Sequence, residues 1–197
     1  MDNLTVERVR PRDRIVEKAR DLFHKYGIRG VGVDTITEAA GTNKMTLYRH
    51  FDSKDDLIIE YLRSVACDMN AVWDQLESAY PGDKIAQLHA WVRGAAECVM
   101  NDDRGCDIAN AAIELTEDCH PARQVIREIK TKMRDRMIRL CREAGIEQPE
   151  RLTDALALLV EGARVNRRSI GPEGPSARLV EIAEDVIESY RRGGQKR

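Results

Sequence analysis

Apolar side chains recur along this chain at spacings of three and four residues, which places them on one face of an α-helix. Glycine, proline and clusters of polar residues interrupt the pattern and mark where one helix ends and the next begins. Aromatic residues make up only 5% of the chain and runs of β-branched residues are scarce, so no segment favours a β-sheet. The pattern predicts an all-α protein, with helices at about residues 12–26, 34–40, 44–51, 54–79, 84–100, 107–116, 121–144, 149–169 and 177–192.

Two of the predicted helices, at 34–40 and 44–51, are short, lie close together and follow a longer one. That order is the layout of a helix-turn-helix, whose second short helix enters the major groove of DNA. Asn43 is a good N-cap for this second helix, and Leu47 and Phe51 lie four residues apart on one apolar face. Its other face offers hydrogen-bond donors from Lys44, Thr46, Tyr48, Arg49 and His50. We expect this helix to read DNA; the alternative is a helical bundle whose polar face meets only solvent.

The charge of the chain is unevenly distributed. Residues 1–50 hold ten Lys and Arg against seven Asp and Glu, a local charge of +3, whereas the remainder carries −5. A weakly basic end on an acidic body agrees with a local DNA footprint rather than with a protein that coats nucleic acid. Four early arginines form either an arm that reaches the minor groove or, as we favour, a solvated terminus: Arg8, Arg10, Arg12 and Arg14.

At this point the residues resemble a known family. The segment 36–51, ITEAAGTNKMTLYRHF, followed by SKDDL at 53–57, closely resembles the signature of the tetracycline-repressor (TetR) family, and ARDLFHKYG at 19–27 looks like that family's first helix. The resemblance covers about residues 12–62. It implies an all-α protein with an N-terminal three-helix DNA-binding domain, residues 1–53, and a larger helical ligand and dimerisation domain, residues 54–197.

Carried over by position, the resemblance implies DNA contacts from Lys44, Met45, Thr46, Tyr48, His50 and Lys54. Lys44 and Thr46 begin the reading helix, where base edges are in reach, whereas Tyr48, His50 and Lys54 suit phosphate contacts. Arg49 stands where the family varies, and it either reads guanine or pairs with phosphate. The chain departs from the family in two places: Gly32 replaces a capping Ser or Thr, and Thr42 replaces an apolar residue of the turn.

Beyond about residue 62 the resemblance gives only architecture. RGCDIANAAIEL, at 104–115, looks like a segment of one broad branch of the family but identifies no ligand. We expect an unknown small-molecule effector to bind between central helices, in a mostly apolar site with a few polar groups. The candidate contacts are Trp73, Trp91, Asn110 and Glu114. The alternative for each of them is a place in the core or on the surface.

Apolar stripes on the last two predicted helices indicate a homodimer. The expected interface residues are Leu156, Leu159, Ala163, Leu179, Ile182 and Val186. The alternative is that both stripes face only their own domain. A dimer suits the DNA motif, because a single reading helix cannot recognise both halves of a palindromic double-stranded operator.

The motifs of other functional classes are missing from the sequence. No nucleophile elbow, metalloprotease motif, phosphate loop or dinucleotide fingerprint occurs, so we expect no enzyme, no catalytic residue, no metal and no cofactor. No membrane span or secretory signal is apparent, which predicts a cytoplasmic protein without a membrane partner. The five scattered cysteines leave a thiol-sensing variant open. The sequence predicts a DNA-binding transcriptional regulator, most simply a repressor that a small molecule releases, with an activator or a regulator without ligand as alternatives.

Overall fold

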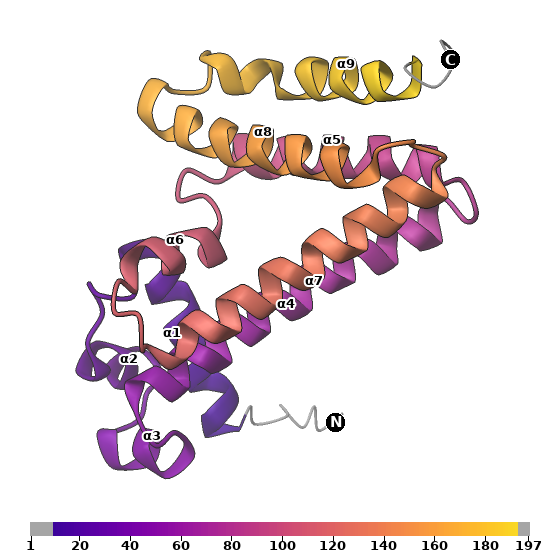
Figure 1. Cartoon of the computed structure of the whole chain (residues 1–197). Coiled ribbons are helices and arrows are strands. Elements are labelled where there is room, and N and C mark those ends of the chain that lie inside the picture. Colours follow the sequence, from indigo (N-terminus) through magenta and orange to yellow (C-terminus); the bar gives the residue numbers. More distant parts are fainter. Residues whose placement is uncertain (1–9, 193–197) are drawn as a thin grey trace, which may run out of the picture. The chain divides into compact units, whose positions relative to one another are not determined.

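The computed structural model describes residues 10–192, and these form nine α-helices and one 3-10 helix without a strand (Figure 1). The predicted all-α fold is confirmed, and each predicted helix is present within about one turn of its expected ends. Among the helices of the described residues, none combines the length and the apolar content that a membrane crossing requires. The elements are α1 (Pro11–Tyr26), α2 (Val33–Ala39), α3 (Lys44–His50), α4 (Lys54–Ala79), α5 (Lys84–Asn101), α6 (Asp107–Glu114), α7 (Pro121–Glu143), α8 (Pro149–Ile170), η1 (Pro175–Arg178) and α9 (Leu179–Arg192).

The chain divides into two compact units. The N-terminal unit contains the residues up to Val65 together with Asn110–Ile126, and the C-terminal unit contains Ala66–Ala109 and the residues from Arg127 onward. Three helices, α4, α6 and α7, pass from one unit into the other. The predicted functional division, residues 1–53 and 54–197, begins its second part where α4 begins, and it stays a prediction.

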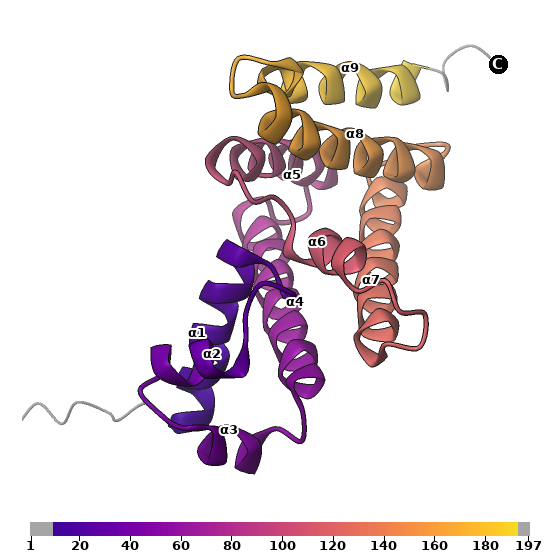
Figure 2. The ribbon, with the colours of Figure 1, turned by 90° about the vertical axis from the view of Figure 1, so that its left-hand side faces the viewer.

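The N-terminal unit is held together by apolar faces of four helices. Helices α1, α2 and α3 pack on one another (Figure 2), as the short helices require because neither is stable alone. The rings of Phe23 on α1 and Tyr61 on α4 lie 5.3 Å apart between centroids. The other side chains that this core buries almost completely include Ile15, Ala19, Ile36, Leu47, Phe51, Leu57, Ile58 and Leu62. Helix α3 is therefore held in place by its apolar side, and its polar side stays exposed.

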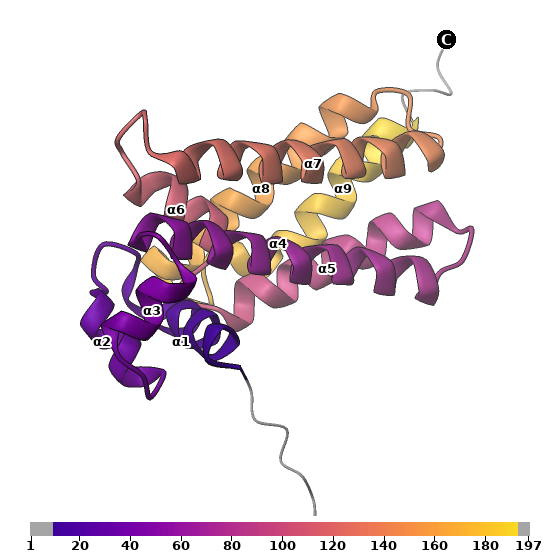
Figure 3. The same cartoon turned by 90° about the horizontal axis from the view of Figure 1, so that it is seen from below.

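The C-terminal unit has its own core. Helices α5, α8 and α9 pack on one another, and α8 and α9 run side by side (Figures 1 and 3). Trp73 on α4 and Met137 on α7 join this core, whose other buried members are Leu88, Val92, Leu140, Cys141, Ile146, Leu152, Leu156, Ala183 and Ile187. Fully burying one such side chain contributes about 1.5–3 kcal/mol, so the unit holds α8 and α9 firmly.

Candidate nucleic-acid interface

The turn between α2 and α3 is fixed by backbone hydrogen bonds and one glycine. The amide of Gly41 donates to Glu38 (3.0 Å) and the amide of Thr42 donates to Thr37 (2.9 Å). Gly41 has a φ of 59°, in the left-handed region that glycine enters without a side-chain penalty. The Asn43 side chain then accepts from the Thr46 amide at 2.9 Å and caps α3, as the sequence predicts.

Helix α3 has one buried and one exposed face. Leu47 is fully buried and Phe51, directly after the helix, is 2% exposed, whereas Met45 is 84% and Tyr48 48% exposed. Large apolar side chains this open are unusual on a short helix and mark a contact surface. A shallow surface depression runs over the exposed face and is lined by Asn43, Lys44, Met45, Thr46, Tyr48 and Arg49. The structure thus brings five of the seven predicted DNA contacts onto one surface.

Lys44 is held in an exposed ion pair. Its Nζ lies 2.8 Å from Asp34 Oδ1 on α2, and the hydrogen bond to that carboxylate raises the pKa of Lys44 above its ordinary value. Both side chains are more than half exposed. Such exposed pairs contribute at most about 1 kcal/mol. Lys44 therefore stays charged and can exchange Asp34 for a base or a phosphate at little cost.

The last predicted α3 contacts differ in exposure. Arg49 is exposed beside Tyr48, so its guanidinium has room to reach either a base or a phosphate. His50 is only partly exposed, and its Nε2 is covered by protein and meets no hydrogen-bond partner among the described residues. The predicted DNA contacts of both residues stay predictions.

Lys54 points into its own unit. Its Nζ donates to the backbone oxygen of Ile28 at 2.8 Å and lies 5.9 Å from the ring centroid of Phe23. Burial lowers the pKa of Lys54 below its ordinary value, and the nearby carboxylates of Asp55 and Glu114 oppose this effect. Its predicted phosphate contact stays a prediction, but this lysine already has a structural contact that sequence reasoning missed.

The two departures from the family pattern are accommodated locally. Gly32 is the N-cap of α2 in an extended conformation with φ −89° and provides no side-chain cap. Thr42 is half-buried and its amide completes the turn. Of the early arginines, Arg8 lies outside the described residues, whereas Arg10 pairs with Asp13, Arg12 pairs with Glu60 at 3.0 Å, and Arg14 donates to the backbone oxygen of Ala40.

Helices α2 and α3 and the turn between them form a helix-turn-helix, and known proteins share it. Residues 15–61, which include α1, α2, α3 and the start of α4, match the model of bacterial regulatory proteins of the tetR family. The chain is a TetR-family transcriptional regulator. A TetR-family transcriptional regulator from Streptomyces coelicolor has a similar structure, with a TM-score of 0.83 and 28% identity over 91% of this chain and 95% of that one.

Curated relatives agree with this assignment. The HTH-type transcriptional regulator AcrR of Shigella flexneri is 22% identical over 77% of this chain and 73% of its own length. The HTH-type transcriptional repressor KstR2 of Rhodococcus jostii is 29% identical over 54% of this chain and 48% of its own length. Both relatives are named as transcriptional regulators.

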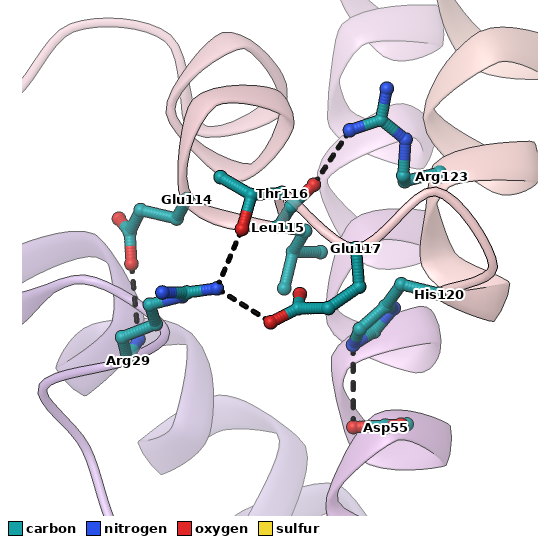
Figure 4. A network of polar contacts seen from close by, with 8 residues as sticks. All are labelled: Arg29, Asp55, Glu114, Leu115, Thr116, Glu117, His120 and Arg123. Carbon is teal, nitrogen blue, oxygen red and sulfur yellow. Dashed lines mark hydrogen bonds and ion pairs between the residues drawn. The ribbon is translucent and has the colours of Figure 1, made fainter.

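The four predicted ligand contacts of this TetR-family chain fall into two groups. Trp73 and Trp91 lie in the C-terminal unit with their rings stacked, 6.3 Å between centroids and 24° between planes. Trp73 is 8% exposed and also meets the guanidinium of Arg136, 5.3 Å from its ring centroid. Asn110 and Glu114 belong to the N-terminal unit. Glu114 Oε2 accepts from the backbone amide of Arg29 at 3.0 Å (Figure 4). Ligand binding by all four stays a prediction.

The predicted dimer residues differ in how much surface they offer. Leu156, Ala163 and Leu179 are at most 8% exposed and pack in the core of their own unit. Leu159 and Val186 are partly buried, and Ile182 is 39% exposed. Sequence reasoning missed Leu158 and Val165 on α8, which are 74% and 67% exposed. Their spacing of seven residues, two helical turns, was the available signal.

The cysteines are free thiols in different surroundings. Cys67, Cys98 and Cys119 are exposed, Cys106 is partly exposed and Cys141 is buried. Burial raises the pKa of the Cys141 thiol, although the Thr153 hydroxyl lies 3.7 Å away and opposes this effect. A raised pKa lowers the fraction of reactive thiolate, so Cys141 is the least suited of the five to thiol sensing.

Proposed function

We propose that this protein represses transcription by binding a palindromic DNA operator in the cytoplasm as a homodimer, and that a small molecule bound in its C-terminal unit releases it. The observation that carries the proposal is the open polar face of α3. There Lys44, Thr46, Tyr48 and Arg49 stand on a helix that Leu47 and the Asn43 cap hold in place. Pre-positioned donors on a fixed helix are what base readout in the major groove requires.

Repression rather than activation is supported by the names of relatives. KstR2 of Rhodococcus jostii and DhaR of a Mycobacterium strain are both HTH-type transcriptional repressors, and the second is 27% identical over 71% of this chain. A repressor needs only to occupy its operator, whereas an activator also needs a surface that recruits polymerase. The role proposed here is therefore non-catalytic.

The homodimer is supported by the exposed face of α8. Leu158 and Val165 lie on one side of this helix, and Ile182 and Val180 of the neighbouring α9 are also exposed. Apolar side chains at such positions are covered in a stable protein, and a second copy of the same face is the simplest cover. A two-fold dimer presents two α3 helices, which suits half-sites about 34 Å apart on one face of DNA.

Release by a small molecule is supported by the stacked pair Trp73 and Trp91. Flat aromatic rings are common in sites for small apolar ligands. Helix α4 is continuous from Lys54, in the N-terminal unit, to Ala79. Trp73 therefore lies on the helix that comes next after α3 in the chain. By linkage, a ligand that weakens DNA binding must itself bind more weakly to the DNA complex, by the same factor.

The proposal is tested by selecting duplexes from a random-sequence library with the wild-type protein. We expect enrichment of an inverted repeat, and loss of enrichment in the double variant Tyr48→Ala/Arg49→Ala. The matched control is Lys25→Ala/Tyr26→Ala, which removes the same kinds of side chain from the exposed end of α1. If the wild type enriches no sequence, or both double variants lose enrichment alike, DNA reading by α3 is wrong.

A small molecule that co-purifies with the protein, identified by native mass spectrometry, serves as the effector probe. Adding it back should release the selected duplex.

A further inference from the structure

One peptide group in the loop between α1 and α2 is bound from both of its sides by charged side chains. The carbonyl oxygen of Ile28 accepts from Lys54 Nζ at 2.8 Å, and the amide of the same peptide, Arg29 N–H, donates to Glu114 Oε2 at 3.0 Å. Lys54 is the first residue of α4 and Glu114 the last of α6. All four residues belong to the N-terminal unit.

The signs of the two charges match the dipole of the peptide. The ammonium faces the negative oxygen and the carboxylate faces the positive amide, so each hydrogen bond polarises the group that makes the other. Charge-assisted hydrogen bonds are stronger than neutral ones. The bond from Lys54 is partly buried and therefore less screened by solvent than a surface ion pair, whereas the bond to Glu114 is exposed. The loop is therefore held in one position by two different helices.

The backbone next to this peptide is shaped to admit the carboxylate. Gly27 has a φ of 80°, and a Cβ atom placed there would lie 2.7 Å from Glu114 Oε1. A larger residue at position 27 would push the flexible end of the Glu114 side chain aside, and glycine adopts this φ without strain. Gly27 also ends α1, its amide donating to the backbone oxygen of Phe23 at 2.9 Å. The close approach of Glu114 is therefore built into the backbone of the loop.

A second acidic residue nearby makes a different kind of contact. The Arg29 guanidinium donates to Thr116 Oγ1 at 2.9 Å and to Glu117 Oε1 at 2.8 Å (Figure 4). The side chains of Arg29 and Glu117 are both more than half exposed, so this pair contributes little. Glu117 touches the side chain of Arg29 but not the peptide, which makes it a matched control for Glu114.

The place of the peptide in the chain connects it with DNA reading. The loop leads directly into α2, and Lys54 begins α4 with three residues between it and the end of α3. The bond from Lys54 to Ile28 therefore connects the segment before the helix-turn-helix with the helix after it. Glu114 binds the amide of the same peptide from a segment more than eighty residues later in the chain. We propose that Lys54 and Glu114 act as positioning residues for DNA binding, by clamping the Ile28–Arg29 peptide and so fixing where α2 and α3 stand. This role rests on the proposed function, because it places the reading helix of a DNA-binding protein.

A direct phosphate contact by Lys54 leads to a different result. Removing a lysine that neutralises a phosphate reduces the magnitude of the slope of log affinity against log salt by about 0.9 per lysine, which is about 1.8 for the two subunits of the proposed dimer. Removing a lysine that only holds the loop weakens binding without changing that slope. Glu114 has no such ambiguity, because a carboxylate is repelled by phosphate.

The clamp itself is tested in the free protein by hydrogen exchange at the Arg29 amide. Glu114→Ala should speed that exchange about tenfold or more, and Glu114→Gln, which keeps an acceptor but not the charge, should lie between this variant and the wild type. Glu117→Gln should leave the Arg29 amide unchanged. Equal exchange in all four proteins would show that Glu114 does not hold this peptide.

Positioning is tested by the affinity of the same proteins for a duplex selected by the wild type, over a salt series. Glu114→Ala should weaken binding about five- to tenfold, with Glu114→Gln between and the salt slope unchanged in both. Lys54→Met should weaken binding similarly, also with an unchanged slope, and the double variant Lys54→Met/Glu114→Ala should lose no more than about the larger single loss.

The two proposals fail in different ways. If the wild type selects no duplex, the proposed function is wrong, while the exchange result still reports whether the clamp exists. If Glu114→Ala speeds exchange but binds the duplex as the wild type does, the positioning role is wrong and the proposed function stands. A salt slope whose magnitude falls by about one counterion per subunit in Lys54→Met, with additive losses in the double variant, would assign Lys54 to phosphate instead.

Discussion

At the scale of single residues, Lys54 and Glu114 both bind the loop after α1, although they are distant from it in sequence. The spacing of Leu47 and Phe51 correctly assigned the buried face of α3 and thereby the exposed one. The partner of Lys54 was not predictable, because Ile28 is distant in sequence and offers a backbone oxygen that no side-chain pattern marks. Glu114 shows the same limit, since its partner lies in the loop after α1.

Lys44 provides the residue-scale test of base reading. Lys44→Ala should relax the preference of the protein at one position per half-site by about 1–3 kcal/mol, because a lysine at the start of the reading helix can donate to guanine. Its exposed pair with Asp34 adds little to stability, so the variant should fold normally. Binding to duplexes changed at single positions measures the effect.

Lys18→Ala is the matched control for that measurement. Lys18 also pairs with exposed carboxylates, Glu17 and Asp21, but lies on α1. The Lys18→Ala variant should keep the base preference of the wild type at every position of the half-site. Equal changes in the two variants would contradict base reading by Lys44.

At the scale of helices, periodicity located every α-helix of the described residues, but not the 3-10 helix η1, and it did not settle what covers each face. The stripe of α8 that includes Leu156 was expected to meet a second subunit, yet Leu156 lies in the core of its own unit. A helix that packs on its own core and also meets a partner has two apolar faces. The spacing of apolar residues does not show which of the two faces meets the partner. The exposed fractions of Leu158 and Val165 distinguish the faces because they include the packing of α5 and α9.

The exposed face of α8 gives the element-scale prediction. Leu158→Glu/Val165→Glu should yield a folded monomer, because these side chains are mostly exposed within the subunit but would become buried, unpaired carboxylates in a dimer. Light scattering measures the mass and circular dichroism the helix content. Val72→Glu, at a side chain 49% exposed on α4, is the control and should stay dimeric. A dimer that survives both α8 substitutions would show that the subunits meet through another surface.

At the scale of the whole molecule, the proposed repressor combines DNA reading by α3, a dimer face on α8 and the clamp of Lys54 and Glu114 on the loop after α1. The family and the helix-turn-helix were readable from about 50 residues, since α2, the turn and α3 are specified by local rules for caps, glycines and apolar spacing. The contribution of residues 110–126 to the N-terminal unit was not readable. It depends on contacts between distant segments, which leave no periodic signal in either one.

The most direct test of the central claim is the affinity of the wild-type protein for its selected operator before and after about five base pairs, half of a helical turn, are inserted at the centre. The insertion keeps both half-sites intact but turns them to opposite faces of the duplex. A dimer that reads both with its two α3 helices should lose at least about a hundredfold in affinity, because one half-site's base contacts are forfeited. Insertion of about ten base pairs, a full turn, restores the facing but adds about 34 Å between the half-sites, so a dimer of fixed spacing should also lose affinity there. The matched control replaces the central base pairs without changing their number and should leave the affinity nearly unchanged. Unchanged affinity after the half-turn insertion would contradict the account.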